Sequence, residues 1–183
     1  MVAGLLKKLF GDKSTKDRKE YQPIIDKSNE FFNSFKSLSD DDLRNKTISF
    51  QGKIKAATSD LEKELSDLNK KAADVNTEIH EKEELFDQID KLVKMIDEKI
   101  EEVLEEIMAE AFAVIKETAR RWAENGHLTV TAKEFDRELS MKKDGITIDE
   151  DKAIWHNKWT AAGADVQWNM VHYDVQLMGG ATG

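Results

Sequence analysis

Few residues of this sequence have both the type and the spacing that catalysis or metal binding requires. There is no cysteine, which excludes a disulfide framework, a thiolate zinc site and a cysteine nucleophile. His127 and His156 have no partners at metal-ligand spacing, so we interpret both as surface or turn histidines. The aspartates at 40–42 could suggest a cation site, but Ser39 before them predicts a helix start, where carboxylates lie over the first-turn N–H groups. We therefore predict no catalytic residue and no metal site in this chain.

The composition limits both the fold and the partners. The chain has 183 residues, with 28 basic and 37 acidic side chains and a net charge of −9, which disfavours a nucleic-acid partner because such a partner requires a basic face. Charged residues make up 36% of the chain, which is typical of long solvated helices, and the single proline argues against an all-β fold. No apolar run reaches the roughly 18 residues that a membrane span requires. The length predicts one domain, or at most two small ones.

The first residues depart from the acidic average of the chain. A short apolar patch with a basic flank would form one face of a helix that ends at Gly11. The residues of this patch and its flank are Leu5, Leu6, Lys7, Lys8, Leu9 and Phe10. One interpretation is an interfacial helix that contacts anionic lipid headgroups. The alternative is a short amphipathic helix that docks on the protein itself.

The middle of the chain has a heptad pattern. Apolar residues recur at alternating spacings of four and three, with Lys82 as the exception. The series is Leu61, Leu65, Leu68, Ala72, Val75, Ile79, Phe86, Ile89, Val93, Ile96, Ile100, Val103 and Ile107. A single helix over 53–124 would be about 110 Å long and would need an external partner. A helical hairpin with its bend in 73–82 is favoured instead, because weak helix formers such as Asn76 lie there.

Beyond the heptads the pattern changes to short alternating segments. Residues 128–131, 145–148, 153–155 and 166–168 are rich in β-favouring side chains and are separated by turn residues. They predict a small antiparallel sheet of about three strands, which needs a helix to cover its apolar face. Three tryptophans are expected in the core of this unit, with a carbohydrate- or peptide-binding face as the alternative. They are Trp155, Trp159 and Trp168.

Several blocks of sequence occur in the order that one known family has. The block at 5–11 is Leu-Leu-Lys-Lys-Leu-Phe-Gly, and the block at 38–47 is Leu-Ser-Asp-Asp-Asp-Leu-Arg-Asn-Lys-Thr. The block at 110–117 is Glu-Ala-Phe-Ala-Val-Ile-Lys-Glu, and the most specific run, at 172–180, is His-Tyr-Asp-Val-Gln-Leu-Met-Gly-Gly. Together these blocks resemble the SecA family of preprotein translocase motor ATPases. The heptad segment and the tryptophan-rich sheet would then be insertions that a subset of the family carries.

The resemblance implies an adenine site in a motor that uses ATP. Gln176 would be the glutamine of the Q motif, whose amide can donate to and accept from the adenine edge. Met170 and Tyr173 would lie near the base, where an apolar or aromatic surface suits a flat ring. The Gly-rich phosphate loop with its lysine does not occur in these residues, so we expect neither tight ATP binding nor hydrolysis by this chain alone. The chain is interpreted as the front end of a longer motor.

The resemblance also implies partners and a location. A cytoplasmic protein, peripheral on the cytoplasmic face of the cell membrane, would contact the Sec channel and preproteins, and would meet acidic phospholipid through residues 5–10. A homodimer is left open. The alternative function is a non-catalytic coiled-coil interaction module.

The expected fold class is α+β and mostly α, with a long coiled-coil-like helical hairpin, a small antiparallel sheet and the start of a motor domain. The expected parts are amphipathic and short helices in 1–50, heptad helices in 51–125, the β insertion in 126–169 and the Q-motif segment in 170–183. Family members usually carry a proline where this chain has Ala109, so the heptad helix is expected to continue past it.

Overall fold

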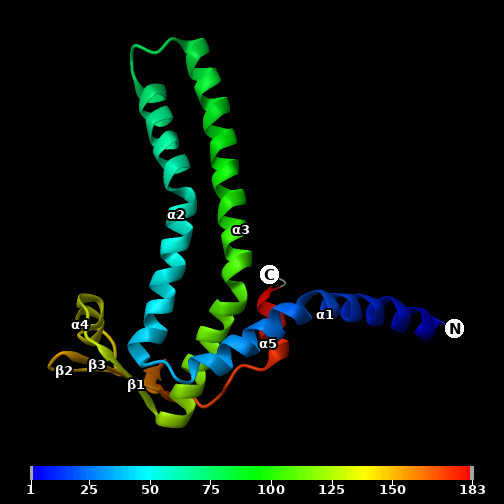
Figure 1. Ribbon diagram of the computed structural model, residues 1–183, viewed down its shortest axis with the longest axis vertical. Coiled ribbons are helices and arrows are strands. Elements are labelled where there is room, and N and C mark those ends of the chain that lie inside the picture. The colour runs from blue at the N-terminus through cyan, green and yellow to red at the C-terminus, as the bar shows by residue number, and fades with distance from the viewer. Residues whose placement is uncertain (1, 182–183) are drawn as a thin grey trace. The chain divides into compact units, whose positions relative to one another are not determined.

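The computed structural model describes the backbone of residues 2–181 and the side chains of residues 19–181. In chain order the elements are α1 (Val2–Phe35), α2 (Asp40–Ala73), α3 (Ile79–Asn125), β1 (His127–Thr131), α4 (Glu134–Ser140), β2 (Ile146–Asp149), β3 (Lys152–His156), β4 (Lys158–Ala161), β5 (Ala164–Gln167) and α5 (Asp174–Ala181) (Figure 1). The expected fold class, α+β and mostly α, is confirmed.

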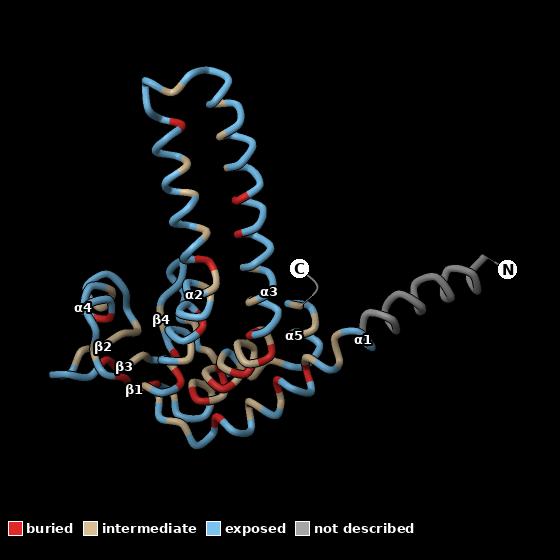
Figure 2. The backbone as a smooth tube through the Cα atoms, turned by 45° about the horizontal axis from the view of Figure 1, so that its top comes forward, coloured by how far each residue is buried: buried red, intermediate tan, exposed pale blue. Residues whose placement is uncertain are grey.

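The chain divides into two compact units. Met1–Lys46 and Met108–Gly183 form the first, which we call the mixed unit, and Thr47–Ile107 forms the second, which we call the hairpin unit. The buried positions of the mixed unit gather where α1, α2 and α3 approach one another (Figure 2). The centre of this core is Phe35, Leu43 and Ala113, with neighbouring apolar side chains packed around it.

Helix α1 is longer than the sequence pattern suggests. It continues through Gly11, so the expectation that this glycine ends a first helix is wrong, since one glycine inside a helix costs only about 1 kcal/mol. Pro23 also lies inside α1. The helix ends at Phe35, whose carbonyl accepts the Leu38 backbone N–H at 3.0 Å.

The start of α2 confirms the predicted helix cap. The Ser39 hydroxyl oxygen accepts the Asp42 backbone N–H at 3.1 Å, and the Asp42 carboxylate accepts the Ser39 backbone N–H at 3.3 Å and its hydroxyl at 2.6 Å. This reciprocal arrangement is a capping box, and the hydrogen bonds from Ser39 lower the pKa of Asp42.

The other two aspartates of the acidic run hold strand β1. Asp40 Oδ2 accepts the Thr129 backbone N–H at 2.8 Å. Asp41 Oδ1 accepts the Thr131 backbone N–H at 3.0 Å, and Asp41 Oδ2 accepts the Thr131 hydroxyl at 2.7 Å. The run therefore serves both the helix start and the attachment of the sheet to it.

One arginine of α3 ties the corner between α1 and α2. The buried Arg121 side chain donates through Nε to Glu117 Oε1 at 2.7 Å and through one terminal nitrogen to Asp40 Oδ1 at 2.6 Å. Its other terminal nitrogen donates to the carbonyls of Phe35 and Leu38, at 2.9 and 2.8 Å. The carbonyl of the last residue of α1 and the Leu38 carbonyl in the turn after it thus receive a charged donor.

The hairpin unit consists of antiparallel segments of α2 and α3. They are joined at 74–78, so the predicted hairpin with its bend in 73–82 is confirmed and the single helix over 53–124 is excluded. In the bend, Asp74 Oδ1 accepts the Asn76 backbone N–H at 2.9 Å, and the Thr77 hydroxyl donates to the Lys71 carbonyl at 2.8 Å. Helix α3 is unbroken through Ala109, as expected from the missing proline.

The heptad prediction is wrong in one detail of α3. Leu92 and Ile96 are buried, at 6% and 8% exposed, and face α2, whereas the predicted seam residues Phe86 and Val93 are 54% and 41% exposed. Leu85 is half-buried in place of Phe86. In the N-terminal half of α3, the residues that face α2 therefore lie one position before the predicted ones. The reason is that an α-helix has 3.6 residues per turn, whereas the heptad pattern assumes 3.5.

The β region has more elements than predicted. Strands β1, β3 and β2 form the expected three-stranded antiparallel sheet in that order. Strand β5 overlaps the predicted segment 166–168, but it pairs with β4 in a separate two-stranded hairpin, and α4 lies between β1 and β2. Neither β4 nor α4 was predicted. The buried residues of the sheet are Leu128, Val130 and Ala153, while the three tryptophans expected in its core are only half-buried.

Candidate functional site

The segment before and within α5 holds the glutamine singled out in the sequence. Gln176 lies in the first turn of α5, and its side-chain Oε1 accepts the Tyr173 backbone N–H at 2.8 Å. The backbone N–H groups of Gln176 and Leu177 donate to the Tyr173 carbonyl, at 2.9 and 3.2 Å. Because an amide oxygen has two lone pairs, Oε1 keeps one acceptor position, and the exposed Nε2 group keeps its donors. The side chain is thus oriented by its own helix start and still offers a donor and an acceptor.

A polar cluster fastens the start of α5 to two other helices. The Lys116 ammonium on α3 donates to Asp174 Oδ1 at 2.9 Å and to Asn29 Oδ1 on α1 at 2.8 Å. The Asn29 amide donates to Asp174 Oδ2 at 3.3 Å, and the Phe32 ring lies 5.2 Å below the Lys116 ammonium. The hydrogen bond from Lys116 lowers the pKa of Asp174, so this carboxylate is ionised at neutral pH.

Apolar contacts complete the seat of α5. Leu177 is 4% exposed, and α5 packs against α1 (Figure 1). A side chain at Gly180 would start 3.6 Å from the Phe112 ring of α3, which is ordinary contact distance. Leu177 and Asp174 therefore fix the helix that carries Gln176 by different means, one apolar and one charged.

Of the three predicted adenine-site residues, two lie together at the start of α5 and the third lies apart from them. The Gln176–Tyr173 hydrogen bond brings these two residues together, and the Tyr173 side chain is strongly exposed, at 71%. Met170 lies in the non-helical segment before α5, where its carbonyl accepts the Trp168 indole N–H at 2.8 Å. Met170 is thus tied to the β region rather than to the start of α5.

Tryptophans line one of the cavities in the mixed unit. This cavity, of about 700 Å³, is bounded by Trp122 of α3 and by Trp155, Trp159 and Trp168 of the β region. The rings of Trp122 and Trp168 lie 6.3 Å apart, and the Trp122 indole N–H donates to the Trp155 carbonyl at 3.1 Å. The half-buried tryptophans therefore hold α3 to the strands around a hollow instead of filling a core.

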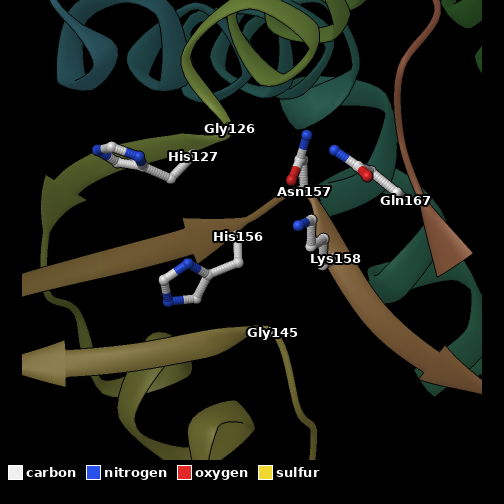
Figure 3. A pocket seen from close by; sticks show the side chains of 7 residues that line it. All are labelled: Gly126, His127, Gly145, His156, Asn157, Lys158 and Gln167. Atoms are coloured by element: carbon white, nitrogen blue, oxygen red, sulfur yellow. The ribbon is translucent and has the colours of Figure 1, made fainter. Parts of the chain in front are cut away.

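A second, polar cavity of about 410 Å³ lies where β3 passes into β4 (Figure 3). His127 and His156, paired across β1 and β3, are exposed on one side of it, and the amides of Asn157 and Gln167 lie together on the other. The buried Asn157 amide donates to the carbonyls of Trp122 and Trp168, at 3.1 Å each. The side-chain N–H groups of Asn157 thus link α3 to the segment that follows β5.

The described part of the chain has neither a metal-binding cluster nor a membrane-spanning helix. No group of three or more His, Asp or Glu side chains among these residues is placed to hold a metal ion. Within the same limits, no helix is long and apolar enough to cross a bilayer. The side chains of the predicted lipid-contact residues lie outside the described residues: Leu5, Leu6, Lys7, Lys8, Leu9 and Phe10.

Sequence reasoning missed the groups that hold the site in place. Asn29, Lys116 and Asp174 come from three helices far apart in the chain, and no local pattern links them. The sequence around Arg121 and Asn157 likewise gives no sign of the contacts that these residues make. The one available signal was that Lys116 and Asp174 each lie within a block that carries the family resemblance.

Comparison with known proteins gives consistent matches. The sequence matches the family described as the SecA DEAD-like domain over residues 6–182. It is 46% identical over 174 residues to the protein translocase subunit SecA of Phocaeicola vulgatus, and 48% identical over 176 residues to that of Christiangramia forsetii. These matches cover 94% and 96% of this chain, so they include the hairpin and the strands, but the chain spans only about 16% of the length of each relative. No solved structure matches the chain with significance.

Proposed function

Since the chain belongs to the SecA family, we propose that it forms the N-terminal part of a protein translocase subunit that couples ATP hydrolysis to preprotein movement. The full-length protein would then act on the cytoplasmic face of the membrane, at the Sec channel. The family match disfavours the alternative of a free-standing coiled-coil module. The role of this chain in the motor would be to supply one wall of the nucleotide site.

The orientation of the Gln176 amide carries this proposal. Adenine offers an N–H donor at N6 beside an acceptor at N7, and the amide offers the matching acceptor and donor. The hydrogen bond from the Tyr173 N–H holds Oε1 in place before any base arrives, so little rotamer freedom is lost on binding. The exposed Tyr173 ring and Met170 side chain supply flat and apolar surface for the base.

A substitution at Gln176 in the full-length protein tests the role of this amide. Gln176→Glu removes the donor to N7 and places a negative charge beside an acceptor, so the KM for ATP should rise about tenfold, as expected for one bidentate base contact. The KM for GTP, whose base presents other groups, should change much less. Gln88→Glu, at an exposed position of the hairpin unit, adds the same charge elsewhere and should leave both values unchanged. An unchanged KM for ATP in Gln176→Glu would contradict the adenine role.

We also propose that residues 5–10 contact acidic phospholipid. The pattern of leucines, a phenylalanine and two lysines suits the boundary between headgroups and acyl chains, although one apolar patch of this length binds weakly. Co-sedimentation with vesicles containing anionic lipid should fall when residues 1–11 are deleted. It should also fall as salt is raised, because the charge attraction is screened. Equal sedimentation of the intact and shortened chains with the vesicles would contradict this proposal.

A further inference from the structure

Within the hairpin unit, α3 carries a buried apolar stripe, which we call the inner stripe, and directly beside it a second apolar stripe that is exposed. The buried Leu92 and Ile96 belong to the inner stripe. The second, which we call the outer stripe, consists of residues that are 82%, 54%, 41% and 43% exposed, in the order Ile79, Phe86, Val93 and Leu104. Their spacings of seven, seven and eleven residues all return to the same side of an α-helix, so the four side chains lie in line.

The outer stripe is edged with acidic residues. Asp90 and Asp97 each follow a stripe residue by four positions, which places them on the same side of α3. Both are exposed, and among the described residues neither forms an ion pair, since the neighbouring Lys94 pairs with Glu98. Acidic side chains also outnumber basic ones nearly two to one over the whole hairpin unit. The outer stripe is therefore apolar along its middle and carries acidic side chains along the edge that points away from the inner stripe.

We propose that the outer stripe docks a basic amphipathic helix of a partner protein. The stripe from Ile79 to Leu104 is about 38 Å long, which suits an antiparallel or parallel helix of about 25 residues. An apolar face of that helix would cover Phe86 and Val93, and lysines or arginines at its edges would meet Asp90 and Asp97.

Charge excludes the two other natural occupants of such a stripe. A second copy of the hairpin would bring the same acidic edge against this one, and like charges in register are destabilising. A membrane with anionic headgroups would be repelled for the same reason. A basic helix is the occupant for which both the apolar stripe and its acidic edge are favourable. The proposal is independent of nucleotide binding, because it concerns the hairpin unit alone.

Titration of the chain with a labelled amphipathic peptide of leucine and lysine tests the proposal. The peptide should bind with an affinity that falls as salt is raised, and a version with glutamate in place of lysine should not bind. The double variant Phe86→Ser/Val93→Ser should weaken binding by at least about tenfold, since central anchors dominate such interfaces. Met95→Ser is the matched control, because Met95 is 50% exposed on the opposite side of α3. It should change affinity by less than about twofold.

Reversal of charge separates docking from general attraction to an acidic protein. The variant Asp90→Lys/Asp97→Lys should no longer bind the lysine peptide and should bind the glutamate peptide instead. Glu84→Lys/Glu102→Lys makes the same change of charge on the other side of α3 and should keep the original preference. Equal losses in the two variants would overturn the proposal, and so would equal losses in Met95→Ser and Phe86→Ser/Val93→Ser.

Self-association is the remaining outcome to measure. Sedimentation of the chain without peptide should give the same mass for the parent and for Phe86→Ser/Val93→Ser. A dimer that this double variant dissolves would identify a second copy as the occupant and would overturn the basic-helix proposal. Far-UV circular dichroism should show unchanged helicity in every variant, since all the substituted side chains are exposed.

Discussion

Replacing Arg121 with methionine should destabilise the mixed unit by about 3 kcal/mol. The Arg121 side chain is only 7% exposed, and it makes four hydrogen bonds, to two carboxylates and two backbone carbonyls. Methionine has a similar length and fills most of the space, so the loss would come from the polar groups left behind rather than from a cavity. These groups lie where the end of α1 meets the start of α2.

The loss of stability in Arg121→Met depends on which hydrogen bonds the former partners of Arg121 retain. Glu117 is fully buried but retains both hydrogen bonds from Arg120, at 2.8 and 2.7 Å. Asp40 retains the backbone N–H of Thr129. The Leu38 carbonyl loses its charged donor, and an unsatisfied buried group costs about 1–3 kcal/mol. Removing one partner of a buried ion pair costs about 3–5 kcal/mol in general, so the surviving partners place Arg121→Met at the lower end of that range.

Tryptophan fluorescence during urea unfolding would measure this loss selectively. All four tryptophans lie in the mixed unit, so their emission reports on that unit, whereas circular dichroism reports on the hairpin as well. Arg137→Met is the matched control, since the Arg137 side chain is exposed and donates to the Glu150 carbonyl rather than to a buried carboxylate. The control should change the free energy of unfolding by less than about 0.5 kcal/mol. A loss in Arg121→Met no larger than in the control would refute the reasoning.

The pH dependence gives a second measure of the same network. Burial raises the pKa of Glu117, but the hydrogen bonds from Arg120 and Arg121 outweigh it, so its pKa in the folded protein is lowered. A lowered pKa contributes stability that is present above the unfolded value, near 4.3, and is lost as the pH falls through the folded value. Removing Arg121 raises the folded pKa of Glu117. Acid unfolding of the mixed unit should therefore begin at a higher pH in Arg121→Met.

Three further predictions follow from the site and its supports. Arg44→Met should also move acid unfolding of the mixed unit to higher pH, as measured by tryptophan emission against pH. The reason is that Arg44 donates two hydrogen bonds to the buried Asp136, and these outweigh the effect of burial and lower the pKa of Asp136. Asp174→Ala should speed hydrogen exchange of the α5 backbone amides by up to about fivefold, the value of one half-exposed ion pair, with α4 amides unchanged. Purified chain of this length should show no ATP turnover above background in a phosphate-release assay, because it contains no phosphate loop and no loop lysine.

Local patterns in the sequence were sufficient for the helical part of the fold. The Ser39 cap was predictable because a capping box needs only four consecutive residues. The bend of the hairpin was predictable because Asp74, Asn76 and Thr77 favour turns over helix. The fine phase of the α3 seam was not, because Leu85 and Phe86, like Leu92 and Val93, are adjacent apolar residues, and only packing against α2 selects between them.

Long-range polar pairing was beyond what the sequence could show. Nothing in the neighbourhood of Lys116 indicates that its partners are Asn29 and Asp174, since a surface lysine on a charged helix has many equivalent alternatives. The β4–β5 hairpin was missed because Lys158–Ala161 is short and only Trp159 in it favours a strand strongly. The adenine-site residues were identified through the family resemblance, and their role stays a prediction.

The β region is joined to the segment before α5 by hydrogen bonds as well as by the chain itself. The Trp168 backbone N–H donates to the Asn157 carbonyl at 2.7 Å, the Asn157 amide donates back to the Trp168 carbonyl, and the Trp168 indole donates to the Met170 carbonyl. The same Asn157 amide also reaches the Trp122 carbonyl near the end of α3. A strand junction thus fixes the point from which the chain runs to Gln176. The strands are for this reason better understood as a brace between α3 and the segment before α5 than as a separate appendage. Hydrogen bonds through Trp168 also connect Asn157 directly to Met170.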